Sequence, residues 1–163
     1  MSDTDEDALN SFLKAEGILH FTGSELLQMQ RAGRKVPVPP KKWWPRILPT
    51  LRLADAIRVK VGCPLIVGNG YRPEPFNREV GGAYFSQHKT FRAVDLDLPQ
   101  TYHSESMMRF FYRVAGEMYL STQENMGLGL YAPWKGSRIH IDTGFRKRHW
   151  EKEYTVPLLL SLR

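Results

Sequence analysis

The amino-acid sequence predicts one domain of the α+β class, in which a small, mainly antiparallel sheet has helices packed on one side. Three observations support this prediction. The length of 163 residues suits a single domain, and a hydrophobic fraction of 42% is enough for a core. The charged fraction of 25% is ordinary for a folded protein, which argues against global disorder. Segments with helical spacing are mixed with short β-prone segments, and the chain contains no internal repeat.

Helical spacing of apolar residues, together with start and stop signals, predicts the helices. They are expected at residues 8–16, 23–32, 45–61 and 104–120, with a short helical turn at 75–80. Thr22 and Glu25 have the spacing of a capping box at the start of the second helix. Pro45 suits the first position of the third helix. Gly33 and Gly62 follow the second and third helices, at the position where glycine commonly ends a helix.

Short β-prone runs predict the strands of the sheet. They are expected at residues 64–67, 92–98, 126–131 and 137–143, and residues 156–162 form either a last strand or an apolar tail. Side chains alternate between the two faces of a strand, so Asp95 shares a face with Asp97, and His140 shares one with Asp142. One face of the predicted sheet is therefore apolar, and the opposite face carries carboxylates and an imidazole.

The composition limits the partners and the compartment. The net charge of +6 favours an anionic partner, namely nucleic acid, anionic lipid or a carboxylate-rich polymer such as the bacterial cell wall. The single cysteine, Cys63, excludes an intramolecular disulfide and a cysteine zinc site. Residues 1–6 are acidic, and we expect a disordered tail there, in front of a domain at residues 7–155. We expect neither a signal peptide nor a membrane span, because no suitable apolar run is present.

Two short segments carry the residue types of a catalytic metal site. The first, residues 86–97, contains His88 and Asp95, and the second, residues 140–144, begins with His140. Two imidazoles and one carboxylate are a ligand set for zinc that leaves one coordination position to water. A loop before one strand, that strand itself and a neighbouring strand are expected to present these side chains to the same side. Spacing alone leaves open the alternative that they are solvated or hydrogen-bonded in place.

Residues 20–150 carry several short motifs in a fixed order. They are His20-Phe21 with Glu25, Gly70-Tyr71-Arg72-Pro73 with Asn77, Val80-Gly81-Gly82-Ala83, Ser86-x-His88 with Ala93-x-Asp95, and Gly129-x-Tyr131 with His140-x-Asp142-x-Gly144 and Trp150. The Ser-x-His and Ala-x-Asp pair with the later His-x-Asp is specific, and the other motifs matter as an ordered set. In these motifs the chain resembles the zinc D-alanyl-D-alanine carboxypeptidases, a family that also includes phage L-alanyl-D-glutamate endopeptidases.

The resemblance implies a hedgehog/D-Ala-D-Ala-peptidase-like fold and a monomeric zinc peptidase. It implies one zinc ion per chain, in a groove on the side of the sheet opposite the helices, with the ligands His88, Asp95 and His140. It assigns Arg72 to the oxyanion that develops on the substrate carbonyl, with a structural salt bridge as the alternative. It also assigns Ser86 and Tyr71 to substrate binding.

The same resemblance implies the substrate class. The expected reaction is hydrolysis of an amide bond in peptidoglycan stem peptides, by a D-Ala carboxypeptidase or an endopeptidase. Together with the expected lack of a signal peptide, this suggests synthesis in the cytoplasm and action at the cell wall after release, as for a phage or prophage endolysin.

Two positions depart from the family pattern. Phe91 stands where the family commonly has glycine, and its ring must be accommodated by packing, with an expected effect on the pocket and the substrate range. Ser137 stands three residues before the last histidine, where related enzymes often carry a glutamate. Asp142 is the candidate substitute for that general base, because it shares a strand face with His140. The alternative role for Asp142 is to orient a ligand histidine through a hydrogen bond.

Two other function classes fit parts of the sequence. A non-catalytic peptidoglycan-binding or phage structural module would keep the fold, and the departures at Phe91 and Ser137 favour it. A nucleic-acid binder would use the positive charge together with Lys41-Lys42 and Trp43-Trp44, and its affinity would fall steeply with salt. The sequence carries no nucleic-acid motif, so no nucleic-acid partner is expected.

Overall fold

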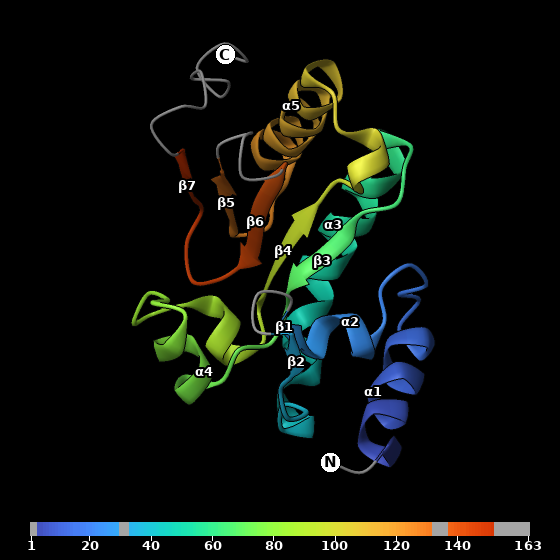
Figure 1. The fold of residues 1–163 in the computed structure, drawn as a ribbon, viewed down its shortest axis with the longest axis vertical. Coiled ribbons are helices and arrows are strands. Elements are labelled where there is room, and N and C mark those ends of the chain that lie inside the picture. Colours follow the sequence, from blue (N-terminus) through green and yellow to red (C-terminus); the bar gives the residue numbers. More distant parts are fainter. Residues whose placement is uncertain (1–2, 30–32, 132–136, 152–163) are drawn as a thin grey trace.

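A five-stranded sheet forms the centre of the computed structural model, which describes residues 3–29, 33–131 and 137–151 (Figure 1). In spatial order its strands are β3 (Ile66–Asn69), β4 (Ala93–Asp97), β6 (Arg138–Thr143), β5 (Met126–Leu130) and β7 (Arg148–Glu151). All neighbouring pairs are antiparallel except β5 and β7, which run parallel. The prediction of an α+β domain with a mainly antiparallel sheet is confirmed.

Two long helices, α3 (Leu48–Val61) and α5 (Glu105–Ser121), cover one face of this sheet. In Figure 1 they lie behind the strands, and they also contact each other. The buried apolar residues of β4 and β6 belong to the core that these helices close; they are Val94, Leu96, Ile139 and Ile141. The polar residues that alternate with them are thereby held on the opposite face.

The N-terminal part packs beside the sheet and supports the segment that follows β3. It consists of α1 (Asp3–Ala15), α2 (Gly23–Leu27), the two-stranded pair β1 (Gln28–Met29) and β2 (Arg34–Lys35), and the 3-10 helix η2 (Lys41–Ile47). The predicted capping box is present, with Thr22 and Glu25 exchanging hydrogen bonds. The backbone amide of Tyr71 donates to the carbonyl of Leu26 at 2.8 Å, which ties α2 to the chain after β3.

Several boundaries differ from the predictions, each for a local reason. Residues 1–6 are predicted to be a disordered tail, but residues 3–6 belong to α1, which begins at Asp3, and residues 1–2 lie outside the described residues. Acidic residues suit the positive end of a helix. The second helix ends at Leu27 rather than 32, because the chain turns into the β1–β2 pair. The third helix begins at Leu48, since residues 41–47 form the 3-10 turn that contains Pro45. Gly62 ends it, as predicted, and adopts the left-handed conformation.

The remaining elements are short and lie between the strands. They are α4 (Glu74–Glu79), η3 (Gln87–Thr90) and η4 (Gln100–Tyr102). Strand β7 was not predicted, and the run at 156–162 lies outside the described residues. Among the helices of the described residues, none combines the length and hydropathy needed to cross a bilayer.

Candidate metal centre

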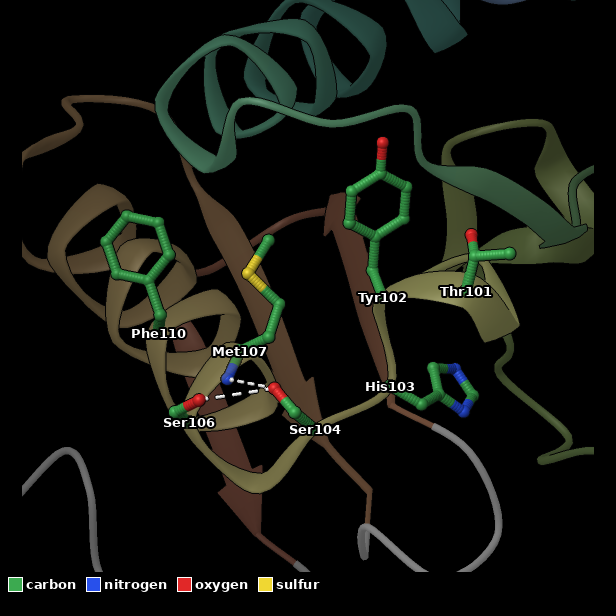
Figure 2. Close-up of a pocket in the computed structure, with 7 residues that line it drawn as sticks. All are labelled: Thr101, Tyr102, His103, Ser104, Ser106, Met107 and Phe110. Atoms are coloured by element: carbon green, nitrogen blue, oxygen red, sulfur yellow. Dashed lines mark hydrogen bonds between the residues drawn. The ribbon is translucent and has the colours of Figure 1, made fainter.

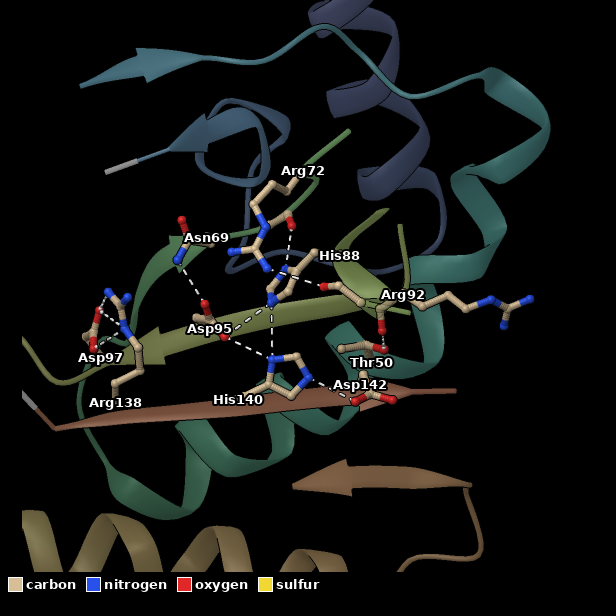
Figure 3. Close-up of polar contacts among 12 residues, drawn as sticks. Thr50, Asn69, Arg72, His88, Arg92, Asp95, Asp97, Arg138, His140 and Asp142 are labelled. Carbon is tan, nitrogen blue, oxygen red and sulfur yellow. Dashed lines mark hydrogen bonds and ion pairs between the residues drawn. The ribbon is translucent and has the colours of Figure 1, made fainter. Parts of the chain in front are cut away.

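Strands β4 and β6 place two of the predicted ligands directly opposite each other. Asp95 pairs with His140 in the antiparallel register, and Ala93 pairs with Asp142. Both ligands lie on the face away from α3 and α5 because their neighbours in sequence point into the core. The third ligand, His88, reaches the same place from η3, just before β4. Figure 3 shows the three side chains converging over the middle of the sheet.

The three ligand atoms form a small triangle. The Nε2 atom of His88 lies 3.1 Å from Nδ1 of His140 and 3.3 Å from Oδ1 of Asp95, and the distance between the last two atoms is 3.0 Å. A tetrahedral zinc ion with bonds of about 2.0–2.1 Å separates its ligand atoms by about 3.3–3.4 Å. The observed triangle is close to one face of such a tetrahedron, so the residues fit a zinc ion.

The outer hydrogen bonds of the ligands fix which atoms face inward. Nδ1 of His88 lies 2.7 Å from the Gly70 carbonyl oxygen, which only accepts, so this nitrogen carries the proton and Nε2 carries a lone pair. Nε2 of His140 lies 2.9 Å from a carboxylate oxygen of Asp142 and donates to it. The Asn69 amide donates to the outer oxygen of Asp95 at 2.8 Å. Each ligand is thus oriented by a partner behind it, which is typical of metal sites.

Burial and charge act in opposite directions on these groups. Burial favours the neutral form of Asp95, but the neighbouring His88 and His140 outweigh it and hold the pKa of this carboxyl well below its usual range. Burial lowers the pKa of His88, against the attraction of Asp95. Burial also disfavours the charged form of His140, yet hydrogen bonds to Asp142 and Asp95 raise its pKa to about 9. The site therefore favours an ionised carboxylate with positive charge beside it, which a divalent cation supplies.

Asp142 lies behind His140, on the side of the ring opposite the other ligands. Its side chain is fully buried, and it accepts hydrogen bonds from His140, from the Gly144 amide at 2.9 Å and from Arg148 at 2.7 and 3.1 Å. A Cβ atom on Gly127 of β5 would lie 2.3 Å from the Asp142 carboxylate, so a side chain there would collide with it. This geometry favours the orienting role of Asp142 over the role of general base.

Arg72 is held beside the cluster by neutral side chains. Its Nε donates to the amide oxygen of Asn77 at 3.1 Å, and its Nη2 donates to the Ser86 hydroxyl at 3.3 Å. Its backbone amide donates to the carbonyl of His88 at 3.1 Å, which ties it to a ligand residue. Asn77 is itself 2% exposed, and its amide nitrogen donates to the backbone carbonyls of Gly82 and Ala83. The predicted site residues Arg72 and Ser86 therefore lie together.

Tyr71 and Phe91 pack beneath the site. The ring of Tyr71 is 8% exposed and lies edge-on to Trp43 and Phe91, at centroid distances of 6.5 and 5.8 Å. Phe91 is fully buried and has a φ of 58°, the only positive value among the non-glycine residues that the structure describes. Glycine adopts this left-handed conformation without strain, which explains why related enzymes commonly have glycine at this position. The Phe91 ring lies in the core, and a direct contact of Tyr71 with substrate stays a prediction.

Two residues that support the ligands, Asn69 and Arg148, did not emerge from the sequence. Asn69 positions Asp95, and Arg148 positions Asp142. In the sequence, Asn69 stands out only as part of a Gly-Asn-Gly turn, and Arg148 only as part of a run of basic residues. Trp150 lies against His140, with a ring centroid distance of 5.1 Å. A Cβ atom on Gly129 would lie 2.5 Å from the Trp150 ring. Ser137 is fully buried and accepts a hydrogen bond from the Leu98 amide, which is a structural role.

A separate open pocket of about 450 Å³ lies at the start of α5 (Figure 2). Its lining is Thr101, Tyr102, His103, Ser104, Ser106, Met107 and Phe110. None of the three ligands takes part in it, so the pocket and the metal centre are different places on the molecule.

A family comparison assigns the chain. The family model described as Peptidase M15 matches residues 19–142, which is more than half of the chain and includes all three predicted ligands. No curated protein matches the sequence significantly. The members of this family are zinc peptidases, in agreement with the His-Asp-His cluster. The chain therefore belongs to the Peptidase M15 family and is a metallopeptidase by family.

Proposed function

We propose that this protein is a zinc-dependent peptidase that hydrolyses amide bonds in peptidoglycan stem peptides. The observation that carries the proposal is the triangle of ligand atoms from His88, Asp95 and His140, with sides of 3.0–3.3 Å. Two nitrogen lone pairs and a carboxylate oxygen that face one another repel unless a proton or a cation lies among them. The three side chains come from different elements, so their convergence depends on the whole fold.

The residues around the ligands have separate tasks. His88, Asp95 and His140 would hold a zinc ion, which would lower the pKa of a water molecule to about 7 and polarise the scissile carbonyl. We assign Arg72 to the oxyanion, because Asn77 and Ser86 fix its guanidinium beside the cluster before substrate arrives. Ser86 is assigned to substrate binding next to that guanidinium. Asp142 holds the Nε2 proton of His140, so that Nδ1 of the ring remains available to the metal.

The substrate class rests on the family and on the charge of the protein. The motifs resemble D-Ala-D-Ala carboxypeptidases and L-alanyl-D-glutamate endopeptidases, which act on stem peptides. A net charge of +6 favours approach to an anionic wall polymer. We further propose that the protein is synthesised in the cytoplasm and acts on the cell wall after its release, as a phage or prophage endolysin does.

Mass spectrometry of muropeptides incubated with the purified protein tests this function. Zinc-dependent loss of a terminal D-alanine would identify a carboxypeptidase, and a cut within the stem or cross-link would identify an endopeptidase. His88→Ala should abolish the product, whereas Asp97→Asn should keep it, because Asp97 binds Arg138 and is not a ligand. A folded protein with bound zinc and no product would instead support a non-catalytic peptidoglycan-binding module.

A further inference from the structure

Three aromatic side chains stand exposed in the loops next to the metal centre. Phe85 is 86% exposed, Phe145 is 84% exposed and Tyr84 is 74% exposed. They are the three most exposed large hydrophobic residues in the part of the chain that the structure describes. Exposed apolar groups that gather in one region commonly mark an interaction surface. We call these three residues the aromatic rim.

The two loops of the rim both adjoin the segment that carries His88. Tyr84 and Phe85 precede η3, and Phe145 lies between β6 and β7. A Cβ atom on Gly144 would come within 3.1 Å of the side chain of Gln87, so the loop between β6 and β7 touches the start of η3, next to His88. Figure 1 likewise shows the turn between β6 and β7 close to the chain that follows α4.

The backbone under Tyr84 and Phe85 is fixed. The buried Asn77 amide donates to the carbonyls of residues 82 and 83, at 3.3 and 3.1 Å. Lys89 donates to the carbonyl of Tyr84 at 2.9 Å, and its ammonium lies 4.9 Å from the centre of the Tyr84 ring. The rings of Tyr84 and Phe85 meet at 90° with their centroids 4.8 Å apart. The Tyr84–Phe85 part of the rim is therefore held in shape before any partner binds, which lowers the entropic cost of binding.

We propose that the aromatic rim binds the amino-sugar ring to which the stem peptide is attached. This inference rests on the proposed function, because a stem peptide in the metal centre brings its glycan strand with it. One to four extended residues place the sugar about 4–14 Å from the bond that is cut. Phe85 is three residues from His88, so their Cα atoms lie within about 11 Å of each other. The reach of the substrate and the position of the rim therefore agree.

The chemistry of the rim suits a sugar. The apolar C–H face of a pyranose ring packs on the face of an aromatic ring, while its hydroxyl groups stay in water at the edge. The Arg92 guanidinium lies 5.8 Å from the centre of the Phe145 ring, and the ammonium of Lys89 lies beside Tyr84. The Arg92 guanidinium matches the carboxylates of the wall peptides that surround the glycan, whereas the Lys89 ammonium is paired with Glu74.

The first experiment measures binding without turnover. The full-length protein, with its metal chelated, is sedimented with insoluble peptidoglycan. Phe85→Ala and Phe145→Ala should each reduce the bound fraction by an amount equivalent to roughly a two- to tenfold loss of affinity, the usual size of an aromatic contact. Leu19→Ala, a control at a residue that is 73% exposed and outside the rim, should bind like the wild type. Unchanged sedimentation of the two phenylalanine variants would overturn the proposal.

A second experiment distinguishes binding to a sugar from binding to a membrane. It also distinguishes the contribution of the rim to substrate binding from its effect on the catalytic step. Phe85→Leu keeps the apolar area and removes the ring, so it should bind peptidoglycan as weakly as Phe85→Ala. If the wild type binds phosphatidylglycerol vesicles but not peptidoglycan, and Phe85→Leu retains the vesicle binding, the rim is a membrane-binding surface and the sugar site is refuted. For a disaccharide-linked peptide the alanine variants should raise KM and keep kcat, and for the free peptide they should change neither. If the wild type binds peptidoglycan through the rim but cleaves no peptide, the proposed function fails and the rim proposal stands.

Discussion

Replacing Asp142 with asparagine tests whether this carboxylate positions His140 or accepts a proton during the reaction. The carboxylate accepts four hydrogen bonds, one from His140, one from the Gly144 amide and two from Arg148. An asparagine amide has one accepting oxygen and one donating nitrogen. In either orientation of the amide, two of the four donors face another donor. Because the residue is fully buried, water does not replace the missing acceptor.

The magnitude follows from these contacts. A buried donor left without an acceptor costs about 1–3 kcal/mol, and loss of one partner of a buried ion pair costs about 3–5 kcal/mol. The Arg148 side chain is 30% exposed and partly rehydrates, so we expect a loss of about 3 kcal/mol in the free energy of unfolding. Loss of the group that orients a histidine ligand typically weakens metal binding by about 10- to 100-fold.

The assay combines urea unfolding, zinc titration against a chromophoric chelator, and turnover at saturating zinc. A positioning role predicts weaker zinc binding, with kcat restored to within about tenfold of the wild type once zinc is saturating. Asp97→Asn is the matched control, because this aspartate also pairs with a strand arginine, Arg138, but contacts no ligand. It should lose stability and keep its zinc affinity. Normal zinc affinity in Asp142→Asn with a fall in kcat of about 100-fold or more would refute the positioning role and favour a general base.

Three further predictions concern the supports of the site. Asn77→Ala removes the acceptor of the Arg72 Nε, so kcat should fall by about 10- to 100-fold with unchanged zinc affinity in a chelator titration; equal losses in both would contradict the assignment. Phe91→Gly relieves about 1–2 kcal/mol of left-handed strain but removes a buried ring worth about 3–5 kcal/mol, so urea unfolding should show a net loss of about 1–4 kcal/mol, and a gain would show that the ring contributes little. Zinc at about 100 times its Kd should raise the Tm by roughly 5–11 °C in a thermal melt, and an equal rise in Asp95→Ala would place the ion elsewhere.

Periodicity was sufficient to predict the strands that carry the site. The alternation of His140 and Asp142 with isoleucines placed both polar residues on one face, and β6 has this arrangement. Periodicity does not reveal which strands are neighbours, so the pairing of Asp95 with His140 came from the structure. The ligand set itself came from the resemblance, because a histidine and an aspartate at this spacing occur in many unrelated loops.

The supports of the ligands were harder to predict, because they act through contacts between distant segments. Asn69 reaches Asp95 from the neighbouring strand β3, and Arg148 reaches Asp142 from a strand that was not predicted. β7 joins β5 in parallel, and such a pairing requires a connection whose course the sequence does not reveal. The early start of α1 was missed because a cluster of acidic residues was interpreted as a tail rather than as the first turn of a helix.

The two glycines of β5 have a consequence for how this protein tolerates mutation. Gly127 leaves room for the Asp142 carboxylate, and Gly129 leaves room for the Trp150 ring. Side chains of the neighbouring strands β6 and β7 therefore cover this part of β5. A single added methyl group at either position would push against a side chain that touches His140. In a saturation screen for activity, these two positions should therefore be as intolerant as the ligands, although neither has a side chain that takes part in the chemistry.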